Sequence, residues 1–131
     1  LLFCLLNPSS KYSEWRMRLK VSEQLRKCKE FFDREILLKS ALELVEDDVA
    51  VVRKDSVKSI AELFDESDIN KLKKMAKSEN HWTRLSAAEI CGLVKLDDYT
   101  DIKKILMNLR NDKVFAVKSE AQKNLDNLSF L

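Results

Sequence analysis

Glycine and proline are almost missing from this chain of 131 residues, which contains one of each, Gly92 and Pro8. Sheet proteins of this size need glycines at their turns, and βαβ folds need them in the loops that bind phosphate groups. The scarcity of both residues argues against these two classes. Because 45% of the residues are hydrophobic, the chain has enough apolar material for a core. We therefore expect a globular protein of helices joined by short turns.

Histidine and cysteine are scarce as well, with one His81 and three widely spaced cysteines, Cys4, Cys28 and Cys91. No two cysteines form a CxxC pair, and His81 has no neighbouring metal ligand, which argues against zinc binding and a disulfide framework. We expect no metal, no cofactor and reduced cysteines, as in cytoplasmic or nuclear proteins. No serine or cysteine accompanies His81 in a nucleophile–base pattern, so we expect no catalytic residues and no enzyme activity.

A long apolar run and an excess of one charge are also missing. No run approaches the roughly 18 residues that a membrane span needs, and the opening LLFCLL lacks the basic start of a signal peptide. Lys and Arg total 24 against 22 Asp and Glu, a net charge of +2 with the signs interspersed. Nucleic-acid binding is therefore not expected. The lysine cluster within residues 71–77 is interpreted as a solvated helix face.

The sequence instead contains a repeated helical pattern. Four segments share a cation followed by small or apolar residues three, seven and ten positions later, which is the spacing of one face of an α-helix. We call the predicted helices that carry this cation the B helices. The four cations are Arg18, Arg53, Arg84 and Lys118.

A second type of predicted helix, the A helix, lies between the B helices. The segments DREILLKSALELVE, SDINKLKKMAK and YTDIKKILMNLR carry Ile36, Ile69 and Ile102, which are 33 residues apart. LLFCLL is interpreted as the end of a further A helix. The links between A and B helices are short and polar. We expect three of their residues to cap the following B helix, namely Asp48, Asn80 and Asp112.

Helix pairs of this length bury their apolar faces only by stacking side by side. The sequence therefore predicts an all-α fold, an αα superhelix of about four helix pairs in a single solenoid domain. The predicted pairs cover about residues 1–28, 31–64, 67–94 and 98–128, and the first is truncated. We expect Phe31 and Phe32 to pack under the first turn between pairs.

One motif resembles the HEAT-repeat family: an Asp, then Val and a cation a few residues later, then Ala three residues on. It is clearest as Asp112 with Val117, Lys118 and Ala121, and Asp48 with Val52 and Arg53 matches it in part. The resemblance implies a ladder in which turn aspartates bind B-helix cations of successive repeats. The implied cations are Arg18, Arg53, Arg84 and Lys118, and the implied acids are Asp48 and Asp112. Asn80 departs from the family pattern.

A narrower resemblance is to the scaffolding A subunits of protein phosphatase 2A. It lies in EWRMRLKVSEQL, in the EFFD that follows, and in the ending NLRNDKVFAVKSEAQKNLDNLSFL, and it covers nearly the whole chain. It implies a non-catalytic scaffold in the cytoplasm, with the nucleus also open. The implied partner is a phosphatase catalytic subunit, held by the turns between A and B helices, and a further regulatory subunit is an open addition.

Carried over by position, Trp15 and Arg16 match the contact pair of that family, and His81 and Arg84 match a second contact turn. Ala50 stands where the family has a tyrosine. Four alternatives stay open. Trp15 either faces a partner or covers the neighbouring helix, and Arg18 is either a ladder cation or a partner contact. Either His81 and Trp82 form a partner contact, or Trp82 is buried while His81 caps its helix. Phe115, equivalent to Trp15, either extends the same surface or belongs to the core.

A second functional class remains as an alternative. Other helical solenoids are adaptors for nucleic acid or for transport and assembly partners. Nucleic-acid binding would require a continuous basic strip along the B helices, for which Lys20, Lys54, Lys58, Arg84 and Lys95 are available. Four acidic residues interrupt this strip: Glu23, Asp55, Glu62 and Glu89.

Overall fold

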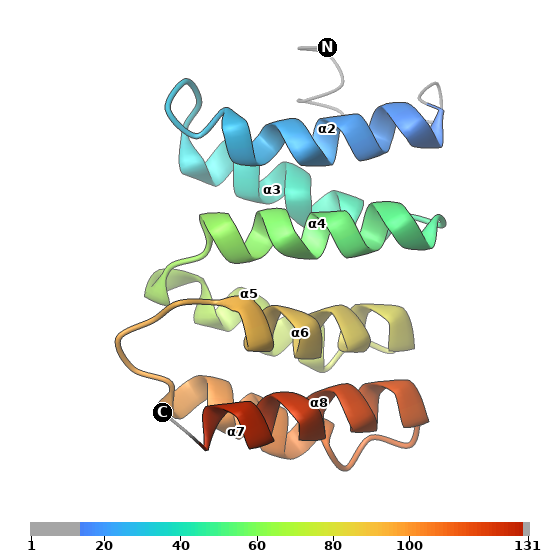
Figure 1. Ribbon diagram of the computed structural model, residues 1–131, viewed down its shortest axis with the longest axis vertical. Helices are drawn as coiled ribbons and strands as arrows, with labels where there is room; N and C mark the ends of the chain where they lie inside the picture. The colour runs from blue at the N-terminus through green and yellow to red at the C-terminus, as the bar shows by residue number, and fades with distance from the viewer. Residues whose placement is uncertain (1–13, 130–131) are drawn as a thin grey trace. The chain divides into compact units, whose positions relative to one another are not determined.

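The computed structural model describes residues 14–129 of the chain, and within that range every regular element is a helix (Figure 1). The elements are α2 (Trp15–Lys27), α3 (Arg34–Leu44), α4 (Ala50–Leu63), the short 3-10 helix η1 (Glu66–Asp68), α5 (Ile69–Ala76), α6 (His81–Leu93), α7 (Thr100–Leu109) and α8 (Phe115–Leu128). The predicted all-α class is confirmed for this range. The helix expected at LLFCLL lies outside the described residues.

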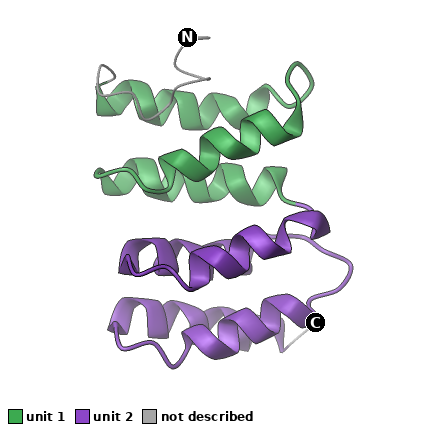
Figure 2. Ribbon diagram, turned by 180° about the vertical axis from the view of Figure 1, so that it is seen from behind, with its two compact units in different colours: residues 1–64 green, residues 65–131 purple. Residues whose placement is uncertain are grey.

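Two compact units divide the chain, residues 1–64 and residues 65–131 (Figure 2). We call them unit 1 and unit 2. The described part of unit 1 contains α2, α3 and α4, and unit 2 contains η1 and α5 to α8. The B helices of the sequence pattern are α2, α4, α6 and α8, and the A helices are α3, α5 and α7. That all repeats form one continuous domain stays a prediction.

In unit 1 the two B helices lie side by side, and α3 packs against both of them. The periodic apolar positions of the three helices supply the core. Its fully buried members include Val21, Leu25, Leu37, Leu38, Leu44, Val52 and Ile60. Burying a side chain of this size stabilises the fold by about 1.5–3 kcal/mol, so this small unit depends strongly on that periodic pattern.

In unit 2 the B helices α6 and α8 form one layer, and the A helices α5 and α7 form the other (Figures 1 and 2). Apolar residues from all four helices fill the space between the layers. They include Leu72, Ala87, Ile90, Cys91, Ile102, Leu106 and Ala121. Desolvation raises the pKa of the buried Cys91 thiol to about 12, so Cys91 is a small apolar core residue rather than a reactive thiol.

The helix starts agree with the sequence at α6 and differ at α4 and α8. Asn80 caps α6, because its side-chain oxygen accepts a hydrogen bond from the Trp82 amide at 2.9 Å. Asp48 was expected to cap α4, and this is wrong. The carboxylate that accepts the Val49 amide, at 2.9 Å, belongs to Asp47. Asp112 was expected to cap α8, and this is also wrong: Asp112 accepts the Val114 amide at 2.9 Å, but Val114 is the N-cap residue of α8 and has no side-chain cap bond.

The beginning of unit 2 is fixed by carboxylates. Asp65 accepts the Ser67 amide at 2.8 Å, and Asp68 accepts the Asp65 amide at 3.0 Å. Asp68 is fully buried and forms an ion pair with Lys71 at 3.0 Å. These bonds form a reciprocal cap that directs the chain from η1 into α5.

No helix within residues 14–129 combines the length and the apolar character that crossing a membrane requires.

Candidate partner-binding turns

The B helices of each unit begin at the same end of that unit (Figure 1). The first residues of α4, α6 and α8 follow short A-to-B links, and Trp15 and Arg16 begin α2. We call Trp15 and Arg16 the unit 1 rim. We call His81, Trp82 and Phe115 the unit 2 rim. These two rims include every partner-contact residue expected from the sequence except Arg84.

Arg84 joins two turns of unit 2. Its Nε donates to Asp112 Oδ2 at 2.7 Å, and its Nη2 donates to Asp112 Oδ1 at 3.2 Å. Its Nη1 donates to the carbonyl oxygens of Ser78 and Glu79 at 2.9 and 3.0 Å. The two charged side chains are only 12% and 9% exposed. One guanidinium therefore fixes the turn before its own helix and the turn before the next B helix.

The same pair occurs in unit 1, where Arg18 Nε and Nη2 donate to the Asp47 carboxylate at 2.5 and 3.2 Å. The resemblance implied Asp48 as the acid of this pair, and the structure corrects that assignment to Asp47. Asp48 contributes only its carbonyl oxygen to Arg53, at 3.0 Å. The signal was present in the sequence. Asp-x-Val precedes the B helix as Asp47 to Val49 and again as Asp112 to Val114.

The other two expected ladder cations are Arg53 and Lys118. Arg53 Nη1 donates to the Asp47 and Asp48 carbonyl oxygens at 2.8 and 3.0 Å, as Arg84 does to its own turn. Lys118 is exposed and forms no ion pair with any residue of the described range. The ladder role expected for Lys118 therefore has no support in residues 14–129.

The Arg–Asp pairs change the proton affinities of their members. The hydrogen bond to Asp112 raises the pKa of Arg84, and the bond to Arg84 holds the pKa of Asp112 below its ordinary value. The pKa of Arg18 is raised by Asp47 in the same way. Each of these shifts favours the charged form of its group, so the Arg84–Asp112 ion pair is maintained at neutral pH.

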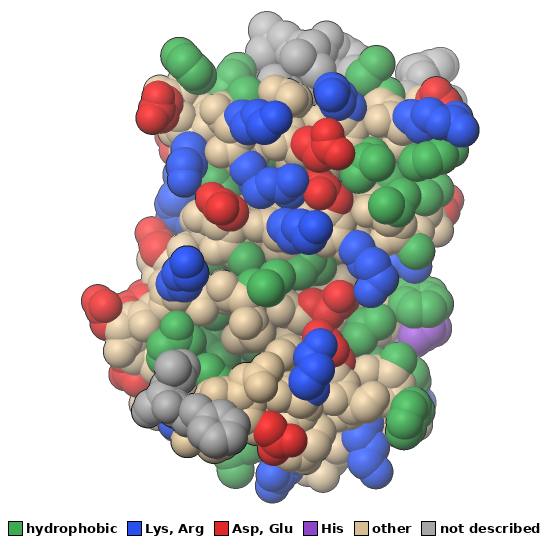
Figure 3. Space-filling model, in the orientation of Figure 1, with side chains coloured by type: hydrophobic (Ala, Val, Ile, Leu, Met, Phe, Trp, Pro, Cys, Tyr) green, Lys and Arg blue, Asp and Glu red, His purple; other side chains and the backbone are tan. Residues whose placement is uncertain are grey.

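The unit 2 rim exposes large rings. Phe115 is 79% exposed and Trp82 is 43% exposed. The His81 ring lies against the Trp82 ring, with centroids 4.4 Å apart and planes inclined by 41°. A core position for Phe115 and a buried Trp82 are therefore both excluded. Asn80, not His81, supplies the helix cap. Figure 3 shows hydrophobic side chains beside the histidine at the right-hand end of this unit.

The unit 1 rim is built around one indole ring. The guanidinium carbon of Arg16 lies 4.5 Å from the centroid of the Trp15 ring, which is cation–π geometry. Arg16 also pairs with Glu14 and keeps 69% of its side chain exposed. Trp15 is half-buried, so part of its ring is accessible at the rim.

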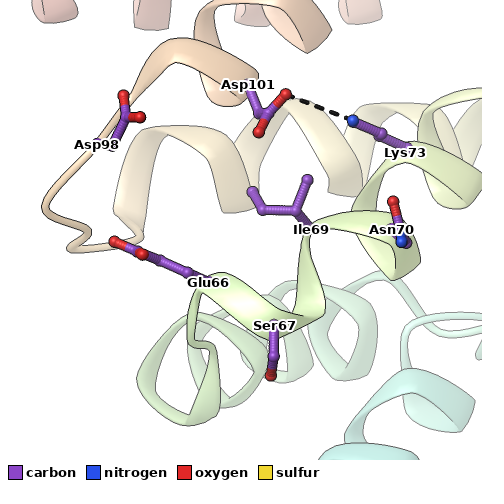
Figure 4. Close-up of a pocket in the computed structure, with 7 residues that line it drawn as sticks. All are labelled: Glu66, Ser67, Ile69, Asn70, Lys73, Asp98 and Asp101. Atoms are coloured by element: carbon purple, nitrogen blue, oxygen red, sulfur yellow. Dashed lines mark ion pairs between the residues drawn. The ribbon is translucent and has the colours of Figure 1, made fainter.

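Two features were not anticipated from the sequence. Phe31 was expected to pack under its turn, and this is wrong, because its side chain is 80% exposed at the opposite end of α2 from the rim. Unit 2 also contains an open groove of about 380 Å³ (Figure 4). Its lining residues are Glu66, Ser67, Ile69, Asn70, Lys73, Asp98 and Asp101.

The carboxylates of this groove bind groups of the same unit. Asp101 pairs with Lys73 at 3.4 Å, and Glu66 accepts the Asp97 amide at 3.1 Å. Asp98 accepts the Thr100 amide and hydroxyl at 2.9 and 2.6 Å, and these bonds lower its pKa. The contacts made by Asp101 and Glu66 therefore hold the start of α5 against the segment around the start of α7. Local sequence patterns did not reveal it because its walls are about 30 residues apart.

Comparisons with known proteins add no family assignment. No protein-family model matches the chain, and no curated protein matches it at a significant level of similarity. The resemblance to HEAT repeats therefore depends on the residues quoted above and on the geometry of the two units.

Proposed function

We propose that this chain is a non-catalytic scaffold of HEAT-like helix pairs that binds a protein partner through its two rims. The proposed partner is the catalytic subunit of a protein phosphatase 2A-like serine/threonine phosphatase. The observation that carries the proposal is the exposure of Trp82 and Phe115 beside turns that the Arg84–Asp112 pair holds in place.

The repeated construction supports a solenoid. Unit 1 and unit 2 both contain neighbouring B helices, and in both the cation of the first B helix binds an Asp in the turn before the second. The spacing between cation and acid is 29 residues in unit 1 and 28 residues in unit 2. Stacking of like units gives extended binding surfaces in repeat proteins.

The chemistry of the rims favours a protein partner. Tryptophan, tyrosine and arginine are the residues most enriched at the energetic centres of protein interfaces, where truncation often costs 2 kcal/mol or more. A rim fixed before binding also loses less conformational entropy when the partner arrives. Trp15 with Arg16 and Trp82 with Phe115 therefore form two preorganised contact sets. A third, regulatory subunit and a cytoplasmic or nuclear location belong to the same proposal.

The alternative of a nucleic-acid adaptor receives less support. In unit 1 two cations of the B helices and the following turn pair with neighbouring acids: Arg26 with Asp55 at 3.1 Å, and Lys29 with Glu62 at 3.4 Å. Figure 3 shows positive and negative side chains mixed on this face. Such a surface lacks the one-sided positive field that binding to phosphates requires.

A pull-down with purified phosphatase 2A catalytic subunit tests the proposal. We expect Trp82→Ala with Phe115→Ala, and separately Trp15→Ala with Arg16→Glu, to weaken binding by about 30-fold each. Phe31→Ala is the matched control, because Phe31 is as exposed as Phe115 and follows the end of α2 opposite the unit 1 rim. Equal binding by wild type and both rim variants would refute the rim assignment. No binding by the wild-type chain would refute the phosphatase partner.

A further inference from the structure

The A helices of unit 2, α5 and α7, form the layer opposite α6 and α8 (Figure 2), and their sequences are rich in cations. Segments 69–77 and 100–110 contain seven cations and one carboxylate, Asp101. The cations are Lys71, Lys73, Lys74, Lys77, Lys103, Lys104 and Arg110. In unit 1 the A helix α3 carries two cations and two carboxylates. A solvated helix face, as expected from the sequence, does not require such an imbalance.

The Lys73–Asp101 pair fixes how α5 and α7 meet. Its two charged atoms are 3.4 Å apart, and Figure 4 shows the side chains pointing toward each other from the two helices. Both helices run in the same direction (Figure 1). Lys77 follows Lys73 by four residues, and Lys104 follows Asp101 by three. Each therefore lies about one helical turn beyond the ion pair.

Beyond the ion pair, the next turn of each helix carries a lysine, Lys77 after α5 residue Lys73 and Lys104 on α7. Lys74, Lys77 and Lys104 are exposed, and none of them forms an ion pair within the described residues. Met107, three residues after Lys104, is 47% exposed on the same helix. We call Lys74, Lys77, Lys104 and Met107 the basic seam. Like charges placed together repel, so a partner that supplies carboxylates would relieve this repulsion.

We propose that the basic seam binds an acidic protein segment that carries an apolar side chain for Met107. This goes beyond the proposed function, because the seam lies on the A helices rather than on the rims. Neither segment 69–77 nor segment 100–110 contains an aromatic residue, so the seam offers no ring for base stacking. Glu66, Asp98 and Asp101 line the groove at the start of both helices. They would repel a uniformly anionic strand or membrane, but not a segment that is acidic at one end only.

Fluorescence anisotropy with a labelled peptide tests this inference. The probe is a short synthetic peptide in which glutamates surround one leucine, and the protein is the full chain. We expect binding that weakens with added salt. We expect Lys74→Glu, Lys77→Glu and Lys104→Glu together to weaken it by about tenfold or more. The matched control changes the same number of charges in unit 1, at Lys20, Lys27 and Lys58, and should bind as the wild type does.

Additional binding measurements distinguish an acidic protein segment from other anionic partners. Replacing the peptide's leucine with serine should weaken binding to the wild type and leave binding to Met107→Ser unchanged. Single-stranded oligonucleotides and phosphatidylserine vesicles should bind more weakly than the peptide. If the glutamate variant does not fold, as judged by circular dichroism, the three Lys→Gln changes replace it.

Two results would overturn the proposal: an equal loss of peptide affinity in the control variant, or tighter binding of the oligonucleotide or the vesicles at the seam. Rim variants should keep peptide binding, so failure of the phosphatase proposal is distinguishable.

Discussion

In each unit an equivalent hydrogen bond joins the two B helices, α2 with α4 in unit 1 and α6 with α8 in unit 2. In unit 1, Ser59 Oγ donates to the Ser22 carbonyl oxygen at 2.7 Å. In unit 2, Asn124 Nδ2 donates to the Ala88 carbonyl oxygen at 2.8 Å. Counted from the shared cations, Ser59 and Asn124 occupy the same position, and so do Ser22 and Ala88. The two units therefore join their B helices at equivalent points.

The two units differ in the residue that stands beside this bond. In unit 1 it is Arg26, which binds the Asp55 carboxylate with two bonds of 3.1 Å and Ser59 Oγ at 2.9 Å. In unit 2 the equivalent residue is Gly92, where an added Cβ would lie 2.4 Å from Asn124 Oδ1.

In unit 1 the short side chain of Ser59 leaves space for Arg26 and its ion pair. In unit 2 the longer side chain of Asn124 requires a glycine, Gly92, at the position equivalent to Arg26. The same helix contact is completed by charge in unit 1 and by close approach in unit 2.

The largest expected effect concerns the feature that both units share. Arg84→Ala leaves Asp112 and two carbonyl oxygens without their donor, so we expect the free energy of unfolding to fall by about 2–4 kcal/mol. Arg18→Ala should cost a similar amount in unit 1. Urea titration of the full chain measures the loss, and hydrogen exchange locates it in one unit. Arg110→Ala, at an exposed residue, is the control. If only one of Arg84→Ala and Arg18→Ala lowers the free energy of unfolding, the two Arg–Asp pairs are not equivalent.

The next effect breaks the close approach in unit 2. Gly92→Ala forces the buried Asn124 side chain away from its acceptor, which we expect to cost about 1–3 kcal/mol, partly offset by the better helix propensity of alanine. Adding Asn124→Ser introduces the side chain that unit 1 has at this position and should recover most of the loss. Thermal unfolding of the single and double variants decides this. If the double variant is no more stable than Gly92→Ala alone, steric pressure on Asn124 is not the cause.

A smaller effect is expected from the ion pair of unit 1. Arg26→Met keeps the aliphatic part of the side chain but removes the donor to Asp55 and Ser59, so the free energy of unfolding should fall by about 1 kcal/mol. Lys27→Met, at the exposed neighbouring position, should change it very little. Chemical denaturation of both variants gives the comparison. If Arg26→Met lowers the free energy of unfolding as much as Arg84→Ala does, the Arg26–Asp55 pair is as important for stability as the Arg84–Asp112 pair.

The smallest effect is the dependence of the Arg84–Asp112 pair on pH. Arg84 lowers the pKa of Asp112 in the folded chain relative to the unfolded chain. The resulting stabilisation is therefore complete above the unfolded pKa, about 4, and is lost as the pH falls through the lower folded pKa. The stability difference between wild type and Asp112→Asn should shrink in acid. Asp97→Asn serves as the exposed control. A difference that stays constant down to strongly acidic pH would contradict this cause.

The rims illustrate how far the sequence predicts a site. Their positions followed from the alignment of the B-helix cations, because helical spacing determines where each helix starts. The exposure of Trp82 and Phe115 did not follow, since an aromatic residue at a helix start packs inward or outward depending on its neighbours. The acid that binds Arg18 was misplaced by one residue because Asp47 and Asp48 are adjacent and chemically identical. Only the turn geometry distinguishes them.

The sequence by itself determined that the described chain is helical, where most of its helices lie and which faces they bury. These properties follow from local spacing and from the scarcity of glycine and proline, and they need no knowledge of distant residues. Only the tertiary structure decided that Asp47 binds Arg18, that Gly92 makes room for Asn124, and that Lys73 binds Asp101. Each of these contacts joins residues about 30 positions apart, so it depends on how the helices pack.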